Sequence, residues 1–555
     1  MLKNGRKILF VEKHCGILSK FAKKRKMKKK IAIIILITFF RLVVQAQNPI
    51  FLPLHRQMQR NADYQNNQLE PNHSSSKPLR ITHTDSALQN QEDERYTWFG
   101  RKLLAEDLIR FTDDKNYNIA INPLFDFTLG KDISQPKNIY TNTRGAIITG
   151  NVGSKFAFST SVHENQGIFA SYMDSFVHEN NVVPGQGRAQ TFTNGKTYDY
   201  YWSAGTISYA PNKYFHFVAG QDKNFIGDGY RSLLLSDAAS NYPFLKIITD
   251  VGPFQYTNIY KKLIDMRSSN LAVDSVYNTK YASAHYLDWA VGKRLNIGLF
   301  ETVVWRNKDR NNAYRGIDIH YLNPIIFFRP VEYQFGSPDN VLVGANFKFK
   351  LNQNNQLYAQ LIIDELKVSE LINRTGWWAN KQGYQIGFKS FNVFGINNLD
   401  FLTEYNRVRP FTYSQRSSRE SYSHQNQPLA HPLGANFWES ATLLSYQNKA
   451  LGLHAKFVYA MYGADSTGTN YGKNVELSYQ QRTPPDYGNF LGQGIKTNQF
   501  FIDVRASYLL NPRTNMRIEL GLVQRKSSSR LENSQNSLIT VGFKTDLWNY
   551  YYDFR

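Results

Sequence analysis

The 555-residue sequence contains one cysteine, Cys15, so a disulfide framework and paired-thiol chemistry are excluded. Enzyme signatures are missing too: no HExxH or GxSxG motif occurs, and the twelve histidines form no cluster at metal-ligand spacing. We therefore expect no catalytic residues, no metal and no cofactor. A hydrolase whose site is assembled from distant strands is the least favoured alternative.

Long apolar runs are also missing. The run from Ile31 to Phe40 is too short for a membrane-spanning helix, which needs ~20 residues. It follows the basic stretch MKKK, and Val44 and Ala46 stand at the minus-three and minus-one positions of a cleavage after Ala46. We interpret residues 27–46 as a secretory signal peptide and residues 1–26 as an upstream extension, so Cys15 would be absent from the mature chain.

Signals for nucleic-acid binding are lacking, because the sequence has no basic helix and no zinc-finger spacing. The net charge of +22 is concentrated at the start: residues 1–46 hold 13 Lys and Arg and a single acid, Glu12. The remainder has 53 basic and 43 acidic residues, a net charge of +10. A mildly basic surface suits acidic glycans or lipopolysaccharide.

Aromatic residues, by contrast, are abundant at 14% of the chain, and apolar residues alternate with polar ones over many short stretches. In NVLVGANFKFKL (340–351), Val343 and Phe347 share one face, while Asn346, Lys348 and Lys350 share the other. This period of two is typical of a strand with one apolar face. An exported membrane protein without spanning helices has to be a closed β-barrel.

The connections between these stretches alternate in length. NPRTN (511–515), QNKA (447–450) and GK (292–293) are short, whereas long segments such as 307–340 and 463–498 lie between them. Short periplasmic turns and long outer loops are typical of outer-membrane barrels. We predict an all-β fold: an antiparallel transmembrane barrel of about 18 strands over residues 118–555, with long loops extracellular and both mature termini periplasmic.

The chain ends with the sequence LWNYYYDFR, in which aromatic rings occupy every second position. We expect a last strand over 537–554 that places Trp548, Tyr550, Tyr552 and Phe554 against lipid, as the inner aromatic girdle and the signal for the insertion machinery. The final Arg555 departs from that pattern, because an insertion signal would be expected to end on an aromatic residue.

Residues 47–117 differ in being polar and rich in Asn and Gln. In WFGRKLLAEDLIRF (98–111), the spacing of Leu104, Leu108 and Phe111 predicts one face of a helix. We interpret 47–117 as a small, partly helical periplasmic segment packed against the barrel mouth. A disordered arm is the alternative.

The longest loops carry mixed aromatic, amide and charged residues, the combination that sugar rings and hydroxyl pairs require. The stretch 222–247 differs, because its LLL run is too apolar for an exposed loop and is expected to fold inward and narrow the pore. An outer aromatic girdle and charges that pair across loops are the alternative explanation for each residue. The candidate glycan-binding residues are Asp222, Asp228, Arg231, Arg329, Glu332, Trp377, Trp378, Glu404, Asn406, Arg407, Arg409, His431, Asn436 and Glu439.

Two groups of motifs resemble a known family. GQDKNFIGDGYRSLLLS followed by YPFLKI is similar to the Wzi-type capsule-assembly barrels. EYNRVRPFTYS followed by HQNQPLAHPLGANFWE resembles the branch known in gliding bacteria as gliding motility protein RemB. The resemblance covers most of residues 95–555. It implies an eighteen-stranded outer-membrane barrel that handles surface polysaccharide and, in gliding species, contributes to adhesion or motility.

These observations lead to one favoured function and one main alternative. We expect a non-enzymatic barrel that binds surface polysaccharide and supports gliding or adhesion. Its partners would be outer-membrane lipid, the polysaccharide, the barrel-insertion machinery and the gliding or adhesin machinery, without nucleic acid. The main alternative is a porin-like channel for solutes or polysaccharide.

Overall fold

The computed structural model describes residues 50–81, 97–113, 116–191, 196–267, 276–309, 311, 313–325, 327–336 and 339–554. The predicted signal peptide and its cleavage after Ala46 lie outside these residues. No helix among the described residues has both the length and the apolar character to cross a membrane.

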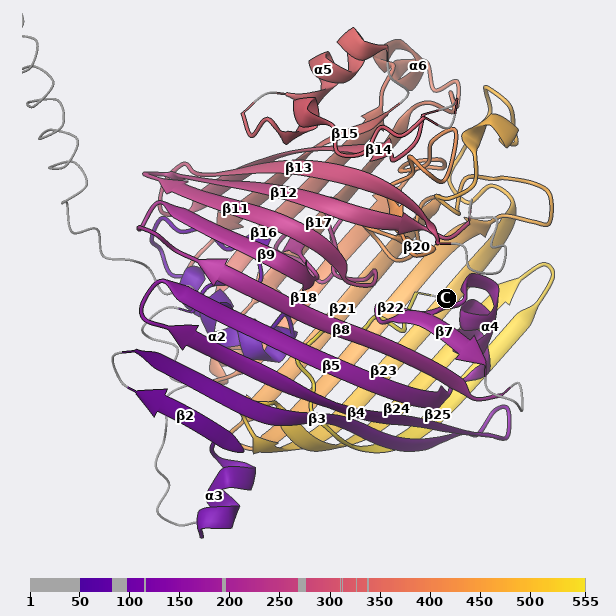
Figure 1. The fold of residues 1–555 in the computed structure, drawn as a ribbon. Coiled ribbons are helices and arrows are strands. Elements are labelled where there is room, and N and C mark those ends of the chain that lie inside the picture. Colours follow the sequence, from indigo (N-terminus) through magenta and orange to yellow (C-terminus); the bar gives the residue numbers. More distant parts are fainter. Residues whose placement is uncertain are drawn as a thin grey trace, which may run out of the picture. The chain divides into compact units, whose positions relative to one another are not determined.

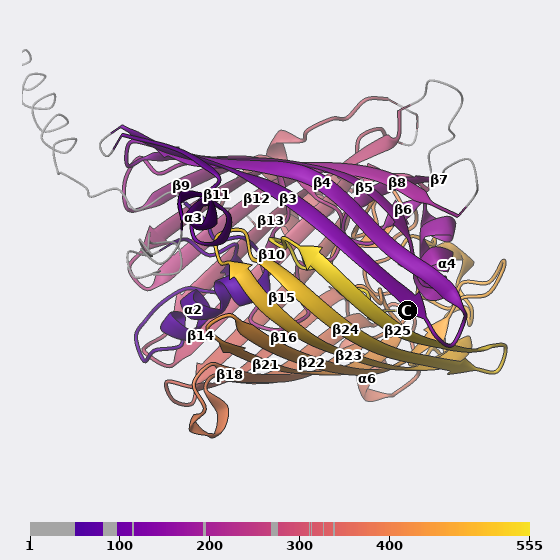
Figure 2. The ribbon, with the colours of Figure 1, turned by 90° about the horizontal axis from the view of Figure 1, so that it is seen from below.

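Eighteen long antiparallel strands form a closed barrel (Figure 1), which confirms the fold predicted from the sequence. Each strand pairs with the next long strand along the chain, and the sheet closes where Leu538–Lys544 of the last strand pair with Asp132–Asp126 of the first. Figure 2 shows this meeting of the indigo and yellow strands. The strands are β3 (Tyr117–Asp132), β4 (Lys137–Val152), β5 (Phe156–Ile168), β8 (Tyr198–Tyr209), β9 (Phe215–Asp222), β11 (Tyr242–Val251), β12 (Phe254–Asp265), β13 (Asn278–Ala290), β14 (Leu295–Arg306), β15 (Asn340–Lys350), β16 (Asn355–Glu365), β17 (Lys381–Ser390), β18 (Leu399–Val408), β21 (Phe437–Asn448), β22 (Leu451–Ala464), β23 (Ile495–Asn511), β24 (Met516–Ser529) and β25 (Asn533–Lys544).

The remaining elements are short and lie at the ends of the barrel or inside it. The helices are α2 (Arg56–Asn66), α3 (Trp98–Leu104), α4 (Ser171–Asn180), α5 (Phe328–Phe335) and α6 (Val368–Ile372), with 3-10 turns η2 (Ile319–Leu322), η3 (Val393–Gly395) and η4 (Tyr479–Gln481). The short strands are β1 (Ser76–Lys77), β2 (Ile109–Asp113), β6 (Val182–Val183), β7 (Gly187–Thr191), β10 (Phe225–Ile226), β19 (Ser423–His424) and β20 (Gln427–Pro428).

The connections differ between the two ends of the barrel. At one end, which we call the short-turn end, neighbouring strands are joined by two to eight residues, for example 252–253 and 391–398. At the other, the long-loop end, they include the segments 307–339, 409–436 and 465–494. The alternation predicted from the sequence is therefore present.

Side chains alternate between the outer wall and the lumen along each strand. On β15, Val343 and Phe347 are exposed on the outer wall, whereas Asn346, Lys348 and Lys350 are buried inside. On β24 the outward residues Ile518, Leu520 and Leu522 are exposed in the same way. Apolar side chains on the outside and polar ones inside are typical of a barrel in a bilayer.

The expected helix through Leu108 and Phe111 is wrong. Helix α3 ends at Leu104, and residues 109–113 form β2, which pairs with residues 121–117 of β3. The reason is that β25 pairs with β3 only as far as Asp126. Without β2, the beginning of β3 would have no partner on that side. Strand β2 fills that place in the sheet.

The expected strand over 537–554 is also wrong in its second half. Strand β25 ends at Lys544, and the segment 545–554, which we call the C-terminal tail, turns into the lumen. Trp548 contacts Trp202 with ring centroids 4.8 Å apart, and Phe554 contacts Phe176 of α4 at 4.9 Å. Figure 1 marks the C-terminus beside α4. The tail therefore runs from the short-turn end toward the long-loop end.

As a result, the predicted inner girdle is not formed by the tail. Trp548 and Phe554 are buried, and the stacked rings of Tyr550 and Tyr552 are partly buried inside the barrel. The outward apolar residues of the last strand are instead Ile539, Val541 and Phe543.

The described part of the N-terminal segment occupies the short-turn mouth. Arg60 of α2 pairs with Asp400 at 2.7 Å, and Asn67 donates to the carbonyl of Gln353 at 2.9 Å, both at short turns. Strand β1 pairs with β10, which belongs to an inward loop described below.

Candidate functional site

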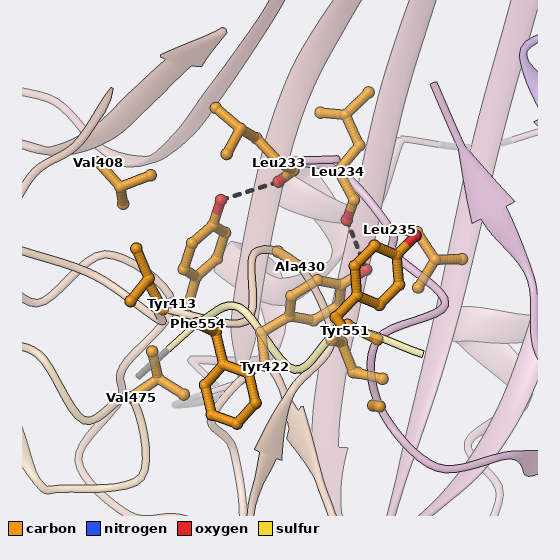
Figure 3. Packing of buried hydrophobic residues seen from close by; sticks show 14 of the residues in the cluster. Leu233, Leu234, Leu235, Val408, Tyr413, Tyr422, Ala430, Val475, Tyr551 and Phe554 are labelled. Atoms are coloured by element: carbon orange, nitrogen blue, oxygen red, sulfur yellow. Dashed lines mark hydrogen bonds between the residues drawn. The ribbon is translucent and has the colours of Figure 1, made fainter. Parts of the chain in front are cut away.

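The connection between β9 and β11, residues 223–241, fills the middle of the lumen. We call it the inward loop. The side chains of Leu233, Leu234 and Leu235 have no exposed surface, and the backbone of the first two accepts hydrogen bonds from the hydroxyls of Tyr413 (2.9 Å) and Tyr422 (2.8 Å) (Figure 3). The apolar stretch is thus a luminal core, as its composition predicted.

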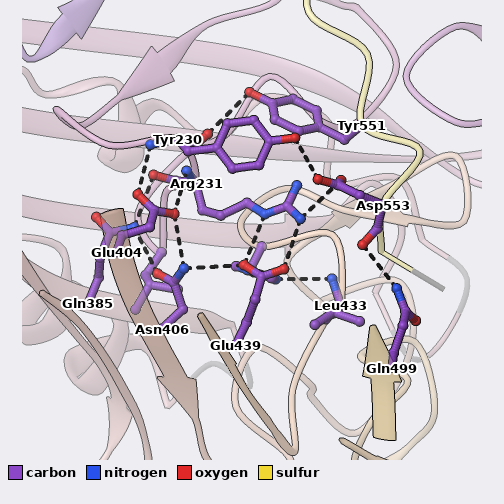
Figure 4. Close-up of polar contacts among 12 residues, drawn as sticks. Tyr230, Arg231, Gln385, Glu404, Asn406, Leu433, Glu439, Gln499, Tyr551 and Asp553 are labelled. Carbon is purple, nitrogen blue, oxygen red and sulfur yellow. Dashed lines mark hydrogen bonds and ion pairs between the residues drawn. The ribbon is translucent and has the colours of Figure 1, made fainter. Parts of the chain in front are cut away.

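Arg231 of the inward loop connects three distant parts of the chain (Figure 4). Its Nε and Nη2 donate to the two carboxylate oxygens of Glu439 at 3.1 and 2.8 Å, and Nη2 also donates to Asp553 at 3.0 Å. Glu404 accepts from the backbone N–H groups of Tyr230 (2.8 Å) and Arg231 (3.0 Å). This set of contacts, which we call the Arg231 cluster, fixes the inward loop to β18, β21 and the C-terminal tail.

The buried charges of the cluster stabilise one another. Burial would lower the pKa of Arg231, but Asp553 and Glu439 raise it well above its ordinary value. Burial would raise the pKa of Asp553, but Arg231 and Lys456 hold it below the ordinary range. The tail carboxylate therefore stays ionised because a buried cation faces it.

His431, in the loop between β18 and β21, completes the cluster as a neutral group. Its Nδ1 accepts from the backbone N–H of Leu433 at 3.1 Å, so its Nε2 carries the proton and donates to Glu439 Oε2 at 2.8 Å. Burial lowers the pKa of His431 although Glu439 opposes that shift. The described residues contain no group of three or more His, Cys, Asp or Glu able to hold a metal ion.

The structure brings together half of the residues predicted to bind glycan, but inside the barrel. For Glu404, Asn406, His431, Asn436 and Glu439 the expectation of an accessible outer surface is wrong, because their polar atoms bond to the chain itself; Asp228 and Arg231 belong to the stretch that was expected to fold inward. The buried residues are Asp228, Arg231, Glu404, Asn406, His431, Asn436 and Glu439.

Two of them show how this burial is stabilised. Asp228 accepts from Ser75 (2.8 Å) and Asn346 (2.9 Å) and so connects the inward loop to the N-terminal segment. Asn436 donates to the carbonyls of Gly463 (2.8 Å) and Gln493 (3.0 Å) and accepts from Gly492 N (2.7 Å). Asn436 therefore positions the loop between β22 and β23.

The other predicted residues lie elsewhere. Asp222 accepts from Trp548 Nε1 at 3.1 Å, and Arg409 donates to the backbone carbonyl of Asn380 at 2.7 Å. Arg407 lies on the outer wall opposite Trp438. Arg329 and Glu332 pair with each other at 3.1 Å on the loop that contains α5.

Trp377 and Trp378 are half-buried and belong to a cluster of loop aromatic residues in which Tyr487 is exposed and Tyr479 is buried. The ring of Trp377 lies 5.1 Å from that of Tyr487, and the ring of Trp378 lies 4.7 Å from that of Tyr479. The guanidinium of Arg482 lies over Trp378 at 4.2 Å. We call these five residues the loop aromatic surface; they come from the connections β16–β17 and β22–β23 at the long-loop end.

Tyr479, Arg482 and Tyr487 were not among the predicted residues. They stand in the segment YQQRTPPDYGNF (479–490), whose residues combine aromatic, charged and turn-forming types. Tyr487 and the nearby Phe490 are more than half exposed. Aromatic faces with an adjacent cation and backbone polar groups can bind the C–H faces and hydroxyls of a sugar.

A cavity of about 670 Å³ remains in the lumen between the C-terminal tail, α2 and the wall formed by β22–β25 and β3–β5. Charges of alternating sign line its wall and pair with one another: Arg505 with Asp503 at 2.8 Å and Arg517 with Glu519 at 3.0 Å. At the long-loop end the lining includes Tyr172 of α4, which is buried. An open cavity therefore remains in the lumen beside the C-terminal tail.

Comparison with known proteins supports the fold. No family model and no curated protein matches the sequence. Among solved structures, Wzi, an outer-membrane protein involved in group 1 capsule assembly in Escherichia coli and described as a carbohydrate-binding β-barrel, has a TM-score of 0.52 at 12% identity. The match covers 89% of this chain and 99% of Wzi. Acinetobacter baumannii OccAB2 (TM-score 0.41, 12% identity, 77% and 97% of the two chains) and Pseudomonas aeruginosa OprD (0.39, 10%, 80% and 97%) are more distant.

Proposed function

We propose that the protein is a non-enzymatic outer-membrane barrel that binds surface polysaccharide at its long-loop end. The protein shares its fold with Wzi. The outward apolar residues of the strands suit an outer-membrane location. The long loops would then face the outside of the cell and the short turns the periplasm.

The observation that carries the binding role is the loop aromatic surface around Trp377 and Trp378. Its rings are held by loop–loop contacts rather than by the outward wall of the barrel, so they are positioned away from lipid. Arg482 lies over the face of Trp378 and pairs with Asp486, so a cation and an acid stand beside an aromatic face, a combination that suits sugar rings and their hydroxyls. Wzi is described as carbohydrate-binding, which agrees with this role.

The proposal is tested by replacing Trp377 and Trp378 with Ala and measuring how much polysaccharide remains on the cell surface. We expect released polysaccharide to increase while the amount of barrel in the membrane stays unchanged. The matched control is Phe394→Ala, because Phe394 is an exposed aromatic residue at the short-turn end. Equal retention in both variants would contradict a role for this surface.

A channel is the second candidate, and the cavity beside the tail is the observation in its favour. The inward loop, the tail and α4 obstruct it, so the arrangement suits an anchor better than a pore. The contribution to gliding motility that the sequence resemblance implies stays a prediction, which cell spreading of a deletion strain tests.

The partner that inserts the barrel would recognise a strand. Because the tail is not part of the sheet, we place the insertion signal in β25, with Ile539, Val541 and Phe543 facing outward. Substituting Phe543 with Asp should reduce insertion, and the same change at Tyr550 in the tail should not.

A further inference from the structure

The connection between β14 and β15, residues 307–339, lies against the outside of the barrel wall. The direction of neighbouring side chains shows this. Lys280 of β13 points into the lumen, where it donates to the carbonyls of Ser418 and Ser421 at 2.9 Å, so His285 five positions later points outward. Glu301 of β14 is directly opposite His285 in the sheet and also points outward. Figure 1 shows α5 outside the wall beside β14 and β15.

This connection covers polar groups that would otherwise face outward. Glu301 accepts from the backbone N–H groups of Phe328 (2.9 Å) and Arg329 (3.1 Å) at the start of α5. The ring of Phe328 lies 4.1 Å from that of His285. On β12, Asn258 donates to the carbonyl of Pro324 at 3.1 Å. The outer wall thus carries a patch of polar side chains, and the loop supplies hydrogen-bond partners for Glu301 and Asn258 in it.

An apolar layer completes the contact. Val303, Trp305 and Val341 of the outer wall are buried against residues of the loop. Their partners there are Tyr321, Phe328 and Val331. Arg315 donates two hydrogen bonds of 2.8 Å to the carboxylate of Asp339, at the end of the same loop. The described part of the loop is therefore docked on the wall as a flap.

The depth of the contact places this flap beside the hydrocarbon. Glu301 is six residues from Leu295, the start of β14 at the short-turn end. A tilted strand advances roughly 2.5 Å per residue along the barrel axis, so Glu301 lies about 15 Å from that end, within an apolar belt of about 25 Å. Leu299 on the same strand and Val343 opposite Glu301 are exposed outward residues of that belt.

The outer side of the flap is apolar at this depth. Ile325 is 83% exposed and Phe327 73% exposed, and both adjoin residues that contact the middle of the wall. The nearby charge of Arg329 is paired with Glu332. Such a surface is unfavourable in water, but it continues the outward apolar belt on either side.

We propose that the described residues of the segment 307–339 form a membrane flap whose exposed face, including Ile325 and Phe327, binds the acyl chains of the outer leaflet. The flap replaces a polar patch of the barrel wall with an apolar surface of its own. This inference rests on the membrane location given under Proposed function, and the test below separates the two.

The test uses spin labels attached to single cysteines in full-length protein carrying Cys15→Ser, reconstituted in phospholipid vesicles. Ile325→Cys and Phe327→Cys are compared with Leu522→Cys on the outer wall of β24 and Ile372→Cys on α6, all exposed positions. Electron paramagnetic resonance then measures collision with oxygen, which concentrates in lipid, and with a water-soluble nickel complex. We expect the oxygen-to-nickel ratio at 325 and 327 to equal that at 522 and to exceed that at 372 several-fold.

Other outcomes have distinct meanings. A ratio at 325 and 327 equal to that at 372 would show that the flap faces water and would overturn the inference. Protection from both reagents would show that a protein, such as a second copy of the chain, covers the flap, which also overturns it. Loss of the lipid pattern at 522 would instead contradict the membrane location itself.

Discussion

Arg231 Nη2 and Asp553 Oδ1 lie 3.0 Å apart in the middle of the barrel although 322 residues separate them in the chain. Both side chains are fully buried. The ion pair joins the inward loop, which follows the fifth long strand, to a tail that follows the last. The filling of the lumen can therefore be completed only when β25 is in place.

Replacing Asp553 with Asn should destabilise the protein strongly. The substitution leaves the buried guanidinium with Glu439 as its remaining carboxylate partner, and breaking a buried ion pair from one side costs about 3–5 kcal/mol. Urea unfolding in detergent, followed by the mobility shift of the folded barrel on gels, measures the loss.

Glu532→Gln is the matched control, because Glu532 is an exposed acid in the turn between β24 and β25. Its effect should stay within about 0.5 kcal/mol. A similar midpoint for the two variants would show that the tail is not held by Arg231.

His424 predicts a dependence of stability on pH. Burial lowers its pKa to about 3, and it accepts from Ile264 N at 3.0 Å through Nδ1. In the unfolded chain the pKa is about 6.5. Between these values the unfolded state binds a proton that the folded state does not, so stability falls as the pH drops from 6.5 toward 3, by up to about 1.4 kcal/mol per pH unit.

His424→Gln keeps the side-chain acceptor and removes the titration. The difference in unfolding free energy between wild type and variant should therefore be constant at pH 7 to 8 and change in favour of the variant as the pH is lowered from 6.5 to 5. Parallel pH profiles of the two proteins would contradict the assignment.

The barrel itself could be predicted from the sequence because apolar and polar residues alternate along each strand. Val343 stands at an odd-numbered position of β15 and Lys348 at an even-numbered one, so their side chains point to opposite faces. Only a wall between lipid and a polar lumen explains an apolar face opposite a charged one. The lengths of the connections distinguish the short-turn end from the long-loop end. Neither signal depends on contacts between distant residues.

The tail could not be predicted in this way. Trp548, Tyr550, Tyr552 and Phe554 alternate as a strand would, but strand formation needs an unpaired edge. The edge of β3 is occupied by β25 at residues 126–132 and by β2 at 117–121. That competition is visible only once all the pairings are known.

The inward direction of the buried site residues is visible in the sequence. Glu404 and Asn406 alternate with Tyr405, and Glu439 follows Trp438. The rings of Tyr405 and Trp438 stack on the outer wall with centroids 6.0 Å apart. Residues of the opposite parity therefore had to point into the lumen, where they bind the inward loop rather than a glycan.

Substitution of Trp548 provides a second test of the position of the C-terminal tail inside the barrel. Its indole contacts Trp202 and His163 and donates to Asp222, so Trp548→Ala should cost about 3–5 kcal/mol through the cavity it leaves. Brominated lipids distinguish this location from the outer wall. Fluorescence of Trp548, taken as the difference between wild type and Trp548→Phe, should resist quenching by bromines at any depth, whereas a lipid-facing tryptophan would be quenched.

Conductance decides between the anchor and the channel. In planar bilayers the wild-type protein should show almost no steady current, because the inward loop fills the centre and the tail closes the cavity beside β3–β5. Deleting residues 547–555 removes the rings of Trp548 to Tyr552 from the lining of that cavity, so current steps should appear. Asp553→Asn in the full-length chain is the informative comparison: it weakens the attachment of the tail without shortening it, and should give brief openings rather than a permanent pore. Large, steady steps in the wild type would instead mean that the tail and inward loop leave the lumen under these conditions, and the porin-like function would then be the better description.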